Sequence, residues 1–345
     1  MDTKQPSRKI NHAFVTGSTG LLGNNLVRAL LKENTQVTAL VRSLDKAKKQ
    51  FGNLQIRFIQ GDLLRPETYV PYLTDCDSLF HTAAFFRDSH KGGKHWQELY
   101  ETNIKGTKNL LQAAYDSGIR QIVHTSSIAV LTGEPDQLIN ETMSRSADTK
   151  NEYYRSKILS DQVVRDFLNL HPDLFIAFVL PGSMYGPGDM GPTSTGQLIL
   201  NYMQKKLPGV MKASYSVVDA RDVADIHIRA MKYGRRGESY LAAGQYMTMQ
   251  ELMNTLEEVT GIPAPRRQIP QPLLKAYATW NEIYHKLTGK PVLVSKDLIE
   301  LFAEEYKRTH FDPTKMETEL GGHFRPVQNT MNDTIKWYRT NGYLK

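Results

Sequence analysis

Short apolar runs and helical patterns alternate through the first half of the chain. Runs typical of β-strands occupy residues 12–16, 36–41, 56–60, 78–82, 121–125 and 175–180. Helical periodicity of apolar side chains occupies residues 21–32, 97–116 and 152–170. Because strands that alternate with helices join into a sheet covered on both faces, the pattern predicts an α/β fold with a doubly wound parallel sheet.

The alternation weakens beyond residue 182. Residues 183–215 are rich in Gly, Pro, Ser and Met, as expected of loops that cover a site. A strand over 216–218 and a helix over 221–233 are assigned to the sheet, and the rest of the chain is mostly helical. We therefore expect a sheet domain and a smaller, mostly helical domain. The first comprises residues 1–182 and 216–233, and the second residues 183–215 and 234–345.

The composition is that of an ordinary globular chain. Of its 345 residues, 40% are hydrophobic, which is enough for a full core. The mean hydropathy is -0.45, and no apolar run approaches the ~18 residues of a membrane span. Residues 1–9 lack the apolar stretch of a signal peptide, and Cys76 is the single cysteine, so no intrachain disulfide is possible. We expect a cytoplasmic protein with no membrane span.

The net charge of +7 raises the question of a nucleic-acid partner. The basic residues are scattered, however, and the densest group, Lys46, Lys48 and Lys49, follows the second predicted strand. A solvated basic face explains such a distribution, so we expect no nucleic-acid partner. An anionic cofactor or substrate accounts better for part of the charge.

A glycine-rich loop, Thr16-Gly-Ser-Thr-Gly-Leu-Leu-Gly23, separates the first predicted strand from the first helix. Gly17 permits a tight turn, Gly20 lets the backbone approach a pyrophosphate, and Gly23 lets the helix pack closely on the strand. The helix N-terminus then presents free N–H groups to the anion. Glycines can also mark a purely structural turn, but the strand before and the helix after favour dinucleotide binding.

The residues after the second and third strands bear on the choice of cofactor. Arg42 stands where an acidic residue would bind the ribose of NAD, and it could hold a 2′-phosphate with help from Lys48 or Lys49. The alternative is a solvent-facing arginine. Asp62 could accept a hydrogen bond from the adenine amino group, with Leu63 beside it, or it could cap the next helix. We expect NADP(H) as the preferred cofactor and NAD(H) as the alternative.

Tyr153 and Lys157 are four residues apart on a predicted helix and share one face. A nearby ammonium favours the phenolate, so the tyrosine can exchange a proton with a carbonyl or alcohol oxygen. Ser127 follows the fifth strand, where its hydroxyl could orient the reacting oxygen or satisfy a turn. His81 and His124 lie within apolar strands as expected of core histidines, and no metal-ligand spacing is present.

Taken together, these motifs resemble the extended short-chain dehydrogenase/reductase family. The matching segments, in family order, are Thr16 to Gly23, Gly61-Asp-Leu63, His81-Thr-Ala-Ala84, Asn103-Ile-Lys-Gly-Thr107, Thr125-Ser-Ser127, Tyr153-Tyr-Arg-Ser-Lys157, Pro181-Gly-Ser-Met-Tyr-Gly-Pro-Gly188 and Val218-Asp-Ala-Arg-Asp-Val-Ala224. The resemblance implies a Rossmann fold. It also implies catalytic roles for Tyr153 as acid/base, Lys157 as the ribose-holding lysine, Ser127 as the substrate-orienting serine and Asn103 as a supporting residue.

The same resemblance implies where the cofactor binds. Ala83 and Ala84 would line its adenine-ribose side, and Pro181 to Ser183 would border the nicotinamide. The full set of expected cofactor contacts is Gly17, Thr19, Gly20, Leu21, Leu22, Gly23, Arg42, Lys48, Asp62, Leu63, Thr82, Ala83, Ala84, Thr125, Tyr153, Lys157, Pro181, Gly182 and Ser183.

Four segments are similar to the dihydroflavonol reductase-like branch of this family, which generally uses NADPH. They are Leu40-Val-Arg42, Leu287-Thr-Gly-Lys-Pro291, Glu319-Leu-Gly-Gly322 and Ile335-Lys-Trp-Tyr-Arg-Thr-Asn-Gly-Tyr343. The branch includes aldehyde and ketone reductases, hydroxysteroid dehydrogenases and proteins named as sugar epimerases. The resemblance also suggests a homodimer formed through the helices that hold Asn103 and Tyr153.

The substrate is less well defined. Phe85 and Phe86 are more apolar than a nucleotide-sugar site suggests, and we expect them, with Met184 and Tyr185, near a hydrophobic carbonyl or alcohol substrate. Core packing explains the two phenylalanines equally well. The leading hypothesis is NADPH-dependent reduction of an aldehyde or ketone. The alternatives are a nucleotide-sugar epimerase or dehydratase with tightly bound NAD, a hydroxysteroid dehydrogenase-like activity and a non-catalytic redox-sensing protein.

Overall fold

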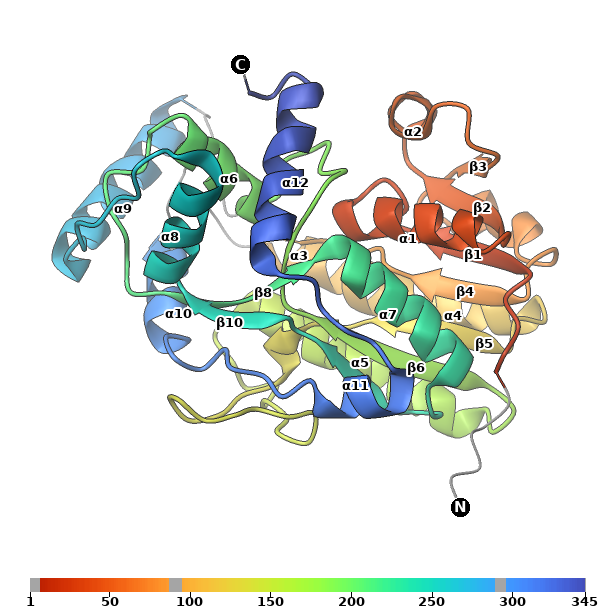
Figure 1. The fold of residues 1–345 in the computed structure, drawn as a ribbon. Coiled ribbons are helices and arrows are strands. Elements are labelled where there is room, and N and C mark those ends of the chain that lie inside the picture. The colour runs from red at the N-terminus through yellow and green to blue at the C-terminus, as the bar shows by residue number, and fades with distance from the viewer. Residues whose placement is uncertain (1–6, 87–94, 289–295, 345) are drawn as a thin grey trace.

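A seven-stranded parallel sheet forms the centre of the protein (Figure 1). The structure is a computed structural model and describes residues 7–86, 95–288 and 296–344. The strand order is β3-β2-β1-β4-β5-β6-β9. The strands are β1 His12–Thr16, β2 Gln36–Val41, β3 Arg57–Gln60, β4 Ser78–His81, β5 Gln121–Thr125, β6 Phe175–Pro181 and β9 Ser239–Ala242. This order reverses at β1, so the predicted doubly wound α/β sheet is confirmed.

Helices cover both faces of this sheet because alternate strand side chains point to opposite sides. In β1, Ala13 and Val15 pack into one apolar core and Phe14 packs into the other. The first core is completed by α1 (Leu21–Lys32), α2 (Leu44–Phe51), α7 (Ala220–Tyr233) and α11 (Thr314–Leu320), and α1 and α7 lie side by side in Figure 1. The second core is completed by α4 (Thr107–Asp116) and α5 (Glu152–Leu170). The bounds of α1 and α5 are those predicted.

The helix expected over residues 97–116 is not uniform. It begins as α3 (Trp96–Leu99), widens into a π-helical segment over Tyr100–Gly106 and continues as α4. Short π segments inside helices are frequent at functional sites, and this one carries Asn103. Short 3₁₀ turns occur at Pro66–Thr68, Val70–Tyr72 and Ile128–Val130.

A second, three-stranded sheet corrects the expectation for residues 216–218. These residues belong to β8 (Ser214–Asp219), which pairs with β7 (Ser183–Tyr185) and β10 (Gln245–Thr248) instead of joining the main sheet. The last strand of the main sheet is β9, in a region expected to be mostly helical. The apolar run of β8 identifies a buried strand, but its pairing partner is set by contacts distant in sequence. The domain boundaries stay a prediction.

Helices pack around this second sheet and form a core of their own. That core includes Tyr185, Leu252 and Met331. The helices of this part are α6 (Ser194–Met203), α8 (Met249–Thr260), α9 (Gln271–Thr288), α10 (Lys296–Glu304) and α12 (Val327–Thr340). The motif at residues 287–291 lies partly outside the described residues.

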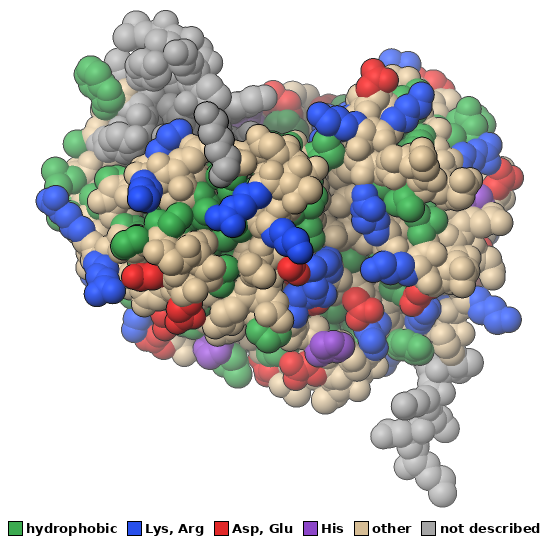
Figure 2. Space-filling model, turned by 45° about the horizontal axis from the view of Figure 1, so that its top comes forward, with side chains coloured by type: hydrophobic (Ala, Val, Ile, Leu, Met, Phe, Trp, Pro, Cys, Tyr) green, Lys and Arg blue, Asp and Glu red, His purple; other side chains and the backbone are tan. Residues whose placement is uncertain are grey.

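On the face drawn in Figure 2, Lys and Arg side chains are spread over the surface among acidic ones instead of forming one patch. Across the three described ranges, every helix is too short or too polar to cross a bilayer.

The turn between β6 and β7 depends on a residue without a side chain. A Cβ at Gly182 would lie 2.5 Å from the carbonyl oxygens of both Ala243 and Ser216. We predict that Gly182→Ala lowers the free energy of unfolding by about 1–3 kcal/mol, because backbone must move to relieve the overlap. Denaturant unfolding of the purified protein measures this. Gly191→Ala is the control, because a Cβ there would contact only the flexible Lys46 Nζ, at 3.9 Å, and it should change stability by less than about 0.5 kcal/mol.

Candidate active site

The expected site residues gather at one edge of the main sheet. In the parallel register, Thr16 at the end of β1 pairs with His81 at the end of β4, and His81 pairs with His124 in β5. Thr125 at the end of β5 pairs with Val179 in β6. The glycine loop, Ser127 and the residues after β6 therefore all leave the sheet at its carboxyl edge, where ligands of such sheets bind.

The glycine loop has the geometry that a dinucleotide requires. Gly17 has a φ of 66°, and a Cβ there would lie 2.7 Å from the Ala83 nitrogen. A Cβ at Gly23 would overlap the Gly17 carbonyl oxygen. Gly20 is the N-cap residue of α1 and has no side chain to cap the helix, so the first N–H groups of the helix stay free to bind an anion. The loop fits a pyrophosphate.

A chain of hydrogen bonds ties the glycine loop to the π-helical segment. The Thr107 hydroxyl donates to the Asn103 carbonyl at 2.7 Å and contacts His81 Nε2 at 2.9 Å. His81 Nδ1 in turn lies 2.8 Å from the Thr16 hydroxyl. Because Thr107 uses its proton on Asn103, His81 donates from Nε2 and accepts at Nδ1. Burial, with His124 and Lys157 nearby, lowers the pKa of His81 well below its usual value, so it stays neutral.

Asn103 joins three segments of the site. Its amide donates to the Phe85 carbonyl at 3.0 Å and accepts from the Phe85 N–H at 2.7 Å. The same amide group donates to the Ser156 hydroxyl at 3.1 Å. The expected supporting asparagine thus holds the strand extension after β4 against α5. Phe86 follows on this extension, and its ring meets Tyr153 edge-on at 4.9 Å.

Tyr153, Ser127 and Lys157 come together at the start of α5. Burial raises the pKa of Tyr153 to about 12, and the Ser127 hydroxyl acts in the opposite direction. Lys157 donates to the Thr125 carbonyl at 2.8 Å. Burial lowers the pKa of Lys157, whereas the nearby Asp161 raises it. In this arrangement the hydrogen bond from Ser127 lowers the pKa of the tyrosine, and the expected effect of Lys157 stays a prediction.

The residues expected to select the cofactor are accessible. Arg42 and Lys48 are exposed, and neither side chain forms an ion pair or hydrogen bond with a described residue. Asp62 accepts the Leu64 N–H at 2.9 Å through one oxygen. This is a local turn contact and not the helix cap expected as the alternative, because the next helical turn, Pro66–Thr68, has Arg65 at its N-cap. The other carboxylate oxygen of Asp62 has no partner among the described residues. Leu63 is buried beside Gly106.

The four expected substrate contacts have different environments. Phe86 is exposed by 55% and lies beside Tyr153, while Phe85 and Met184 are half-buried. Tyr185 is only 1% exposed and belongs to the core around the second sheet, so the structure does not support it as a substrate contact. Its position between Pro181-Gly182 and Gly186-Pro187, which both indicate loops, concealed the short strand that buries it.

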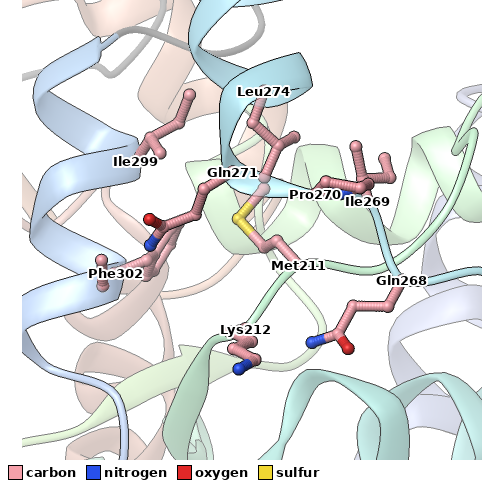
Figure 3. Close-up of a pocket in the computed structure, with 10 residues that line it drawn as sticks. Met211, Lys212, Gln268, Ile269, Pro270, Gln271, Leu274, Ile299 and Phe302 are labelled. Atoms are coloured by element: carbon pink, nitrogen blue, oxygen red, sulfur yellow. The ribbon is translucent and has the colours of Figure 1, made fainter.

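Sequence reasoning missed a cavity in the helical part of the chain. This cavity of about 490 Å³ lies between α9, α10 and the segment that leads into β8 (Figure 3). Apolar side chains line most of it and Lys212, Gln268 and Gln271 add polar groups; the apolar lining is Met211, Ile269, Pro270, Leu274, Ile299, Phe302 and Ala303. Such a volume can hold a small molecule. Within the described ranges, no three His, Cys, Asp or Glu side chains converge to bind a metal.

An ion pair connects this region to α5, the helix that carries Tyr153. Glu305 follows α10 directly and pairs with Arg145 at 2.9 Å, and both side chains are largely buried. The Arg145 guanidinium also donates to the Leu131 carbonyl at 3.1 Å and lies 4.7 Å from the centre of the Tyr154 ring. Tyr154 is the neighbour of Tyr153, so one end of α10 is fixed next to the candidate site.

Comparison with known proteins identifies the family. The NAD dependent epimerase/dehydratase family matches residues 13–243. The chain is 31% identical over 342 residues to a putative dihydroflavonol 4-reductase of Synechocystis sp., covering 96% of each chain. It is 35% identical over 336 residues to sterol demethylase protein B of Methylococcus capsulatus, covering 96% of this chain and 99% of the other.

Solved structures agree with this assignment. The crystal structure of gox2253 superposes with a TM-score of 0.81 at 28% identity, covering 97% of this chain and all of the other (100%). The dTDP-glucose 4,6-dehydratase DesIV of Streptomyces venezuelae, solved with NAD, shares the fold with a TM-score of 0.76 at 22% identity, covering 97% of this chain and 99% of the other. The chain therefore belongs to the extended short-chain dehydrogenase/reductase family, whose NAD(P)-dependent members are oxidoreductases, epimerases and dehydratases.

Proposed function

We propose that this protein is an NADPH-dependent reductase of aldehydes or ketones, which also catalyses the reverse oxidation of the alcohol. The proposal depends on one observation. Tyr153, Ser127 and Lys157 lie together at the sheet edge from which the glycine loop also extends, and the geometry of this loop suits a dinucleotide. The similarity to a putative dihydroflavonol 4-reductase along almost the whole chain supports a reductase.

The residues around the loop would hold the cofactor. The N-terminus of α1 would bind the pyrophosphate, and Arg42 would pair with a 2′-phosphate, for which its unpaired guanidinium is suited. Lys157 would hold the nicotinamide ribose. When bound, NADPH supplies the hydride.

Tyr153 would act as the general acid. Because burial raises the pKa of its hydroxyl to about 12, the phenol carries its proton at neutral pH and can give it to a carbonyl oxygen. Ser127 would hydrogen-bond the same oxygen and orient it. In the reverse direction Tyr153 must first lose its proton, so alcohol oxidation should gain rate as the pH rises. The protonated tyrosine therefore favours reduction at neutral pH.

An apolar substrate fits this site best. The exposed ring of Phe86 lies against Tyr153, so the approach to the tyrosine hydroxyl is partly apolar.

The second candidate is an epimerase or dehydratase that retains NAD, favoured by the family match and by a fold shared with an NAD-bound dehydratase. The amount of coenzyme bound to protein that is purified without added coenzyme distinguishes the two candidates. A retained equivalent of NAD supports the epimerase or dehydratase, whereas free exchange of coenzyme supports the reductase.

Tyr153→Phe tests the proposed chemistry. Removing the acidic proton should lower kcat/KM for carbonyl reduction by about 10²–10⁴-fold. Loss of NADPH absorbance with a panel of apolar aldehydes and ketones measures it. Tyr154→Phe is the control, because this neighbouring hydroxyl has no hydrogen bond to a described residue, and it should keep activity within a few-fold. Unchanged turnover in Tyr153→Phe would show that the mechanism is wrong.

Arg42→Ala tests the cofactor preference. A lost charge-assisted pair of about 1.5–3 kcal/mol should raise KM for NADPH about tenfold or more and leave KM for NADH nearly unchanged. Steady-state kinetics with both coenzymes measures this. Arg57→Ala is the control, because Arg57 is at the opposite, amino end of β3 and pairs with Asp75. Equal use of the two coenzymes by the parent protein contradicts the preference.

A further inference from the structure

A buried carboxylate lies one helical turn beyond Lys157. Asp161 and Lys157 are both on α5, four residues apart on the same face, and are exposed by only 7% and 3%. The Asp161 carboxylate accepts the Ser126 hydroxyl at 2.5 Å through one oxygen. Its other oxygen lies 3.2 Å from His124 Nε2. Asp161 therefore connects α5 to the end of β5, next to Ser127.

His124 does not neutralise this carboxylate. Its Nδ1 is buried without a partner among the described residues, so a second proton there would have no acceptor. Burial accordingly lowers the pKa of His124. The ring is a neutral imidazole that donates its Nε2–H to Asp161. The negative charge is left to act on the ammonium of Lys157.

Lys157 needs such a charge. Its described hydrogen bond goes to the neutral Thr125 carbonyl, and burying an ammonium without an opposite charge is costly. Asp161 is the acidic group that raises the pKa of Lys157 against the effect of burial. The titratable and charged groups around Asp161 are Lys157, Tyr153 and Arg165 of α5, His124 of β5 and, next to His124, His81 of β4 and His227 of α7.

We propose that Asp161 is a positioning residue for the reduction, which keeps the Lys157 ammonium charged and fixes the end of β5 through Ser126. Asp161 touches neither cofactor nor substrate in this assignment. It acts through Lys157, which must stay charged to hold the ribose, and through the strand end from which Ser127 extends. The assignment rests on the proposed function, and one of its two tests is independent of turnover.

The first test is the pH dependence of carbonyl reduction in Asp161→Asn. Asparagine keeps the size of the side chain and removes its charge, so Lys157 should lose its proton at lower pH. We expect the alkaline limb of the profile of kcat/KM against pH to shift to lower pH by about 1–3 units. Ser126→Ala keeps the Asp161 charge but removes the hydrogen bond between Ser126 and Asp161. This variant should therefore lower kcat and leave the pH of the alkaline limb unchanged. Asp166→Asn, an exposed acid on the same helix, is the control and should match the parent.

The second test measures the free energy of unfolding of the parent and Asp161→Asn between neutral and alkaline pH. Below the folded-state pKa of Lys157, the parent has an attraction that the variant lacks. As the pH rises through that pKa, Lys157 becomes neutral and the attraction disappears. The stability difference should therefore be largest near neutral pH and shrink at alkaline pH. A difference that does not change with pH overturns the proposal.

The outcomes separate the two assignments. Unchanged turnover in Tyr153→Phe contradicts the reductase mechanism but leaves the unfolding test of Asp161 valid. A parental alkaline limb in folded Asp161→Asn, or the same shift in Ser126→Ala, overturns the role of the charge. If Asp161→Asn gives no cooperative unfolding transition, Asp161→Glu replaces it. That variant keeps the charge and should keep the parental limb, and a shifted limb there counts against the proposal.

Discussion

The close approach of two backbone segments determines much of this structure. Gly17 leaves β1 so near to Ala83, after β4, that a side chain at Gly17 would overlap backbone. Thr16 and His81 hydrogen-bond across the same junction. Since β1 and β4 are neighbours, their ends can meet only if the loop has no Cβ at this point. The start of α1, the glycine loop and the extension that carries Phe86 all take their positions from this contact.

Local periodicity predicted the elements of the main sheet well. Residues 21–32 and 152–170 are α1 and α5 as expected, because the period of apolar residues identifies an amphipathic helix within one segment. The pairing of β8 could not be predicted in this way, since its apolar run is equally suited to either sheet. Strand β9 is four residues long and follows a helix in a mostly helical region, so its pattern was too short to detect.

The candidate site was predicted in part for similar reasons. Tyr153 and Lys157 are recognised by their spacing on one helix, and Ser127 by its place after a strand. Asp161 shares that helix face, yet its contacts with Ser126 and His124 depend on how α5 packs against β5. Such packing is a tertiary property with no local sequence signal. Beside Tyr153 and Lys157 the structure thus has neutral histidines and a few buried charges, an environment in which each charge has a large effect.

The π-helical segment over Tyr100–Gly106 determines which changes of length this helix can accept. A π turn contains one residue more than an α turn. Helices α3 and α4 therefore form one continuous helix, in which the side chains before and after the π segment differ in their angle around the helix axis. Removing any single residue here would restore the α-helical phase and rotate the preceding turn by about 100°. Trp96, which lies 4.7 Å from the Arg155 guanidinium on α5, would then face a different direction. Apart from Asn103, which joins three segments, and Gly106, which packs closely on Leu63, positions in this segment should tolerate substitutions more readily than deletions or insertions.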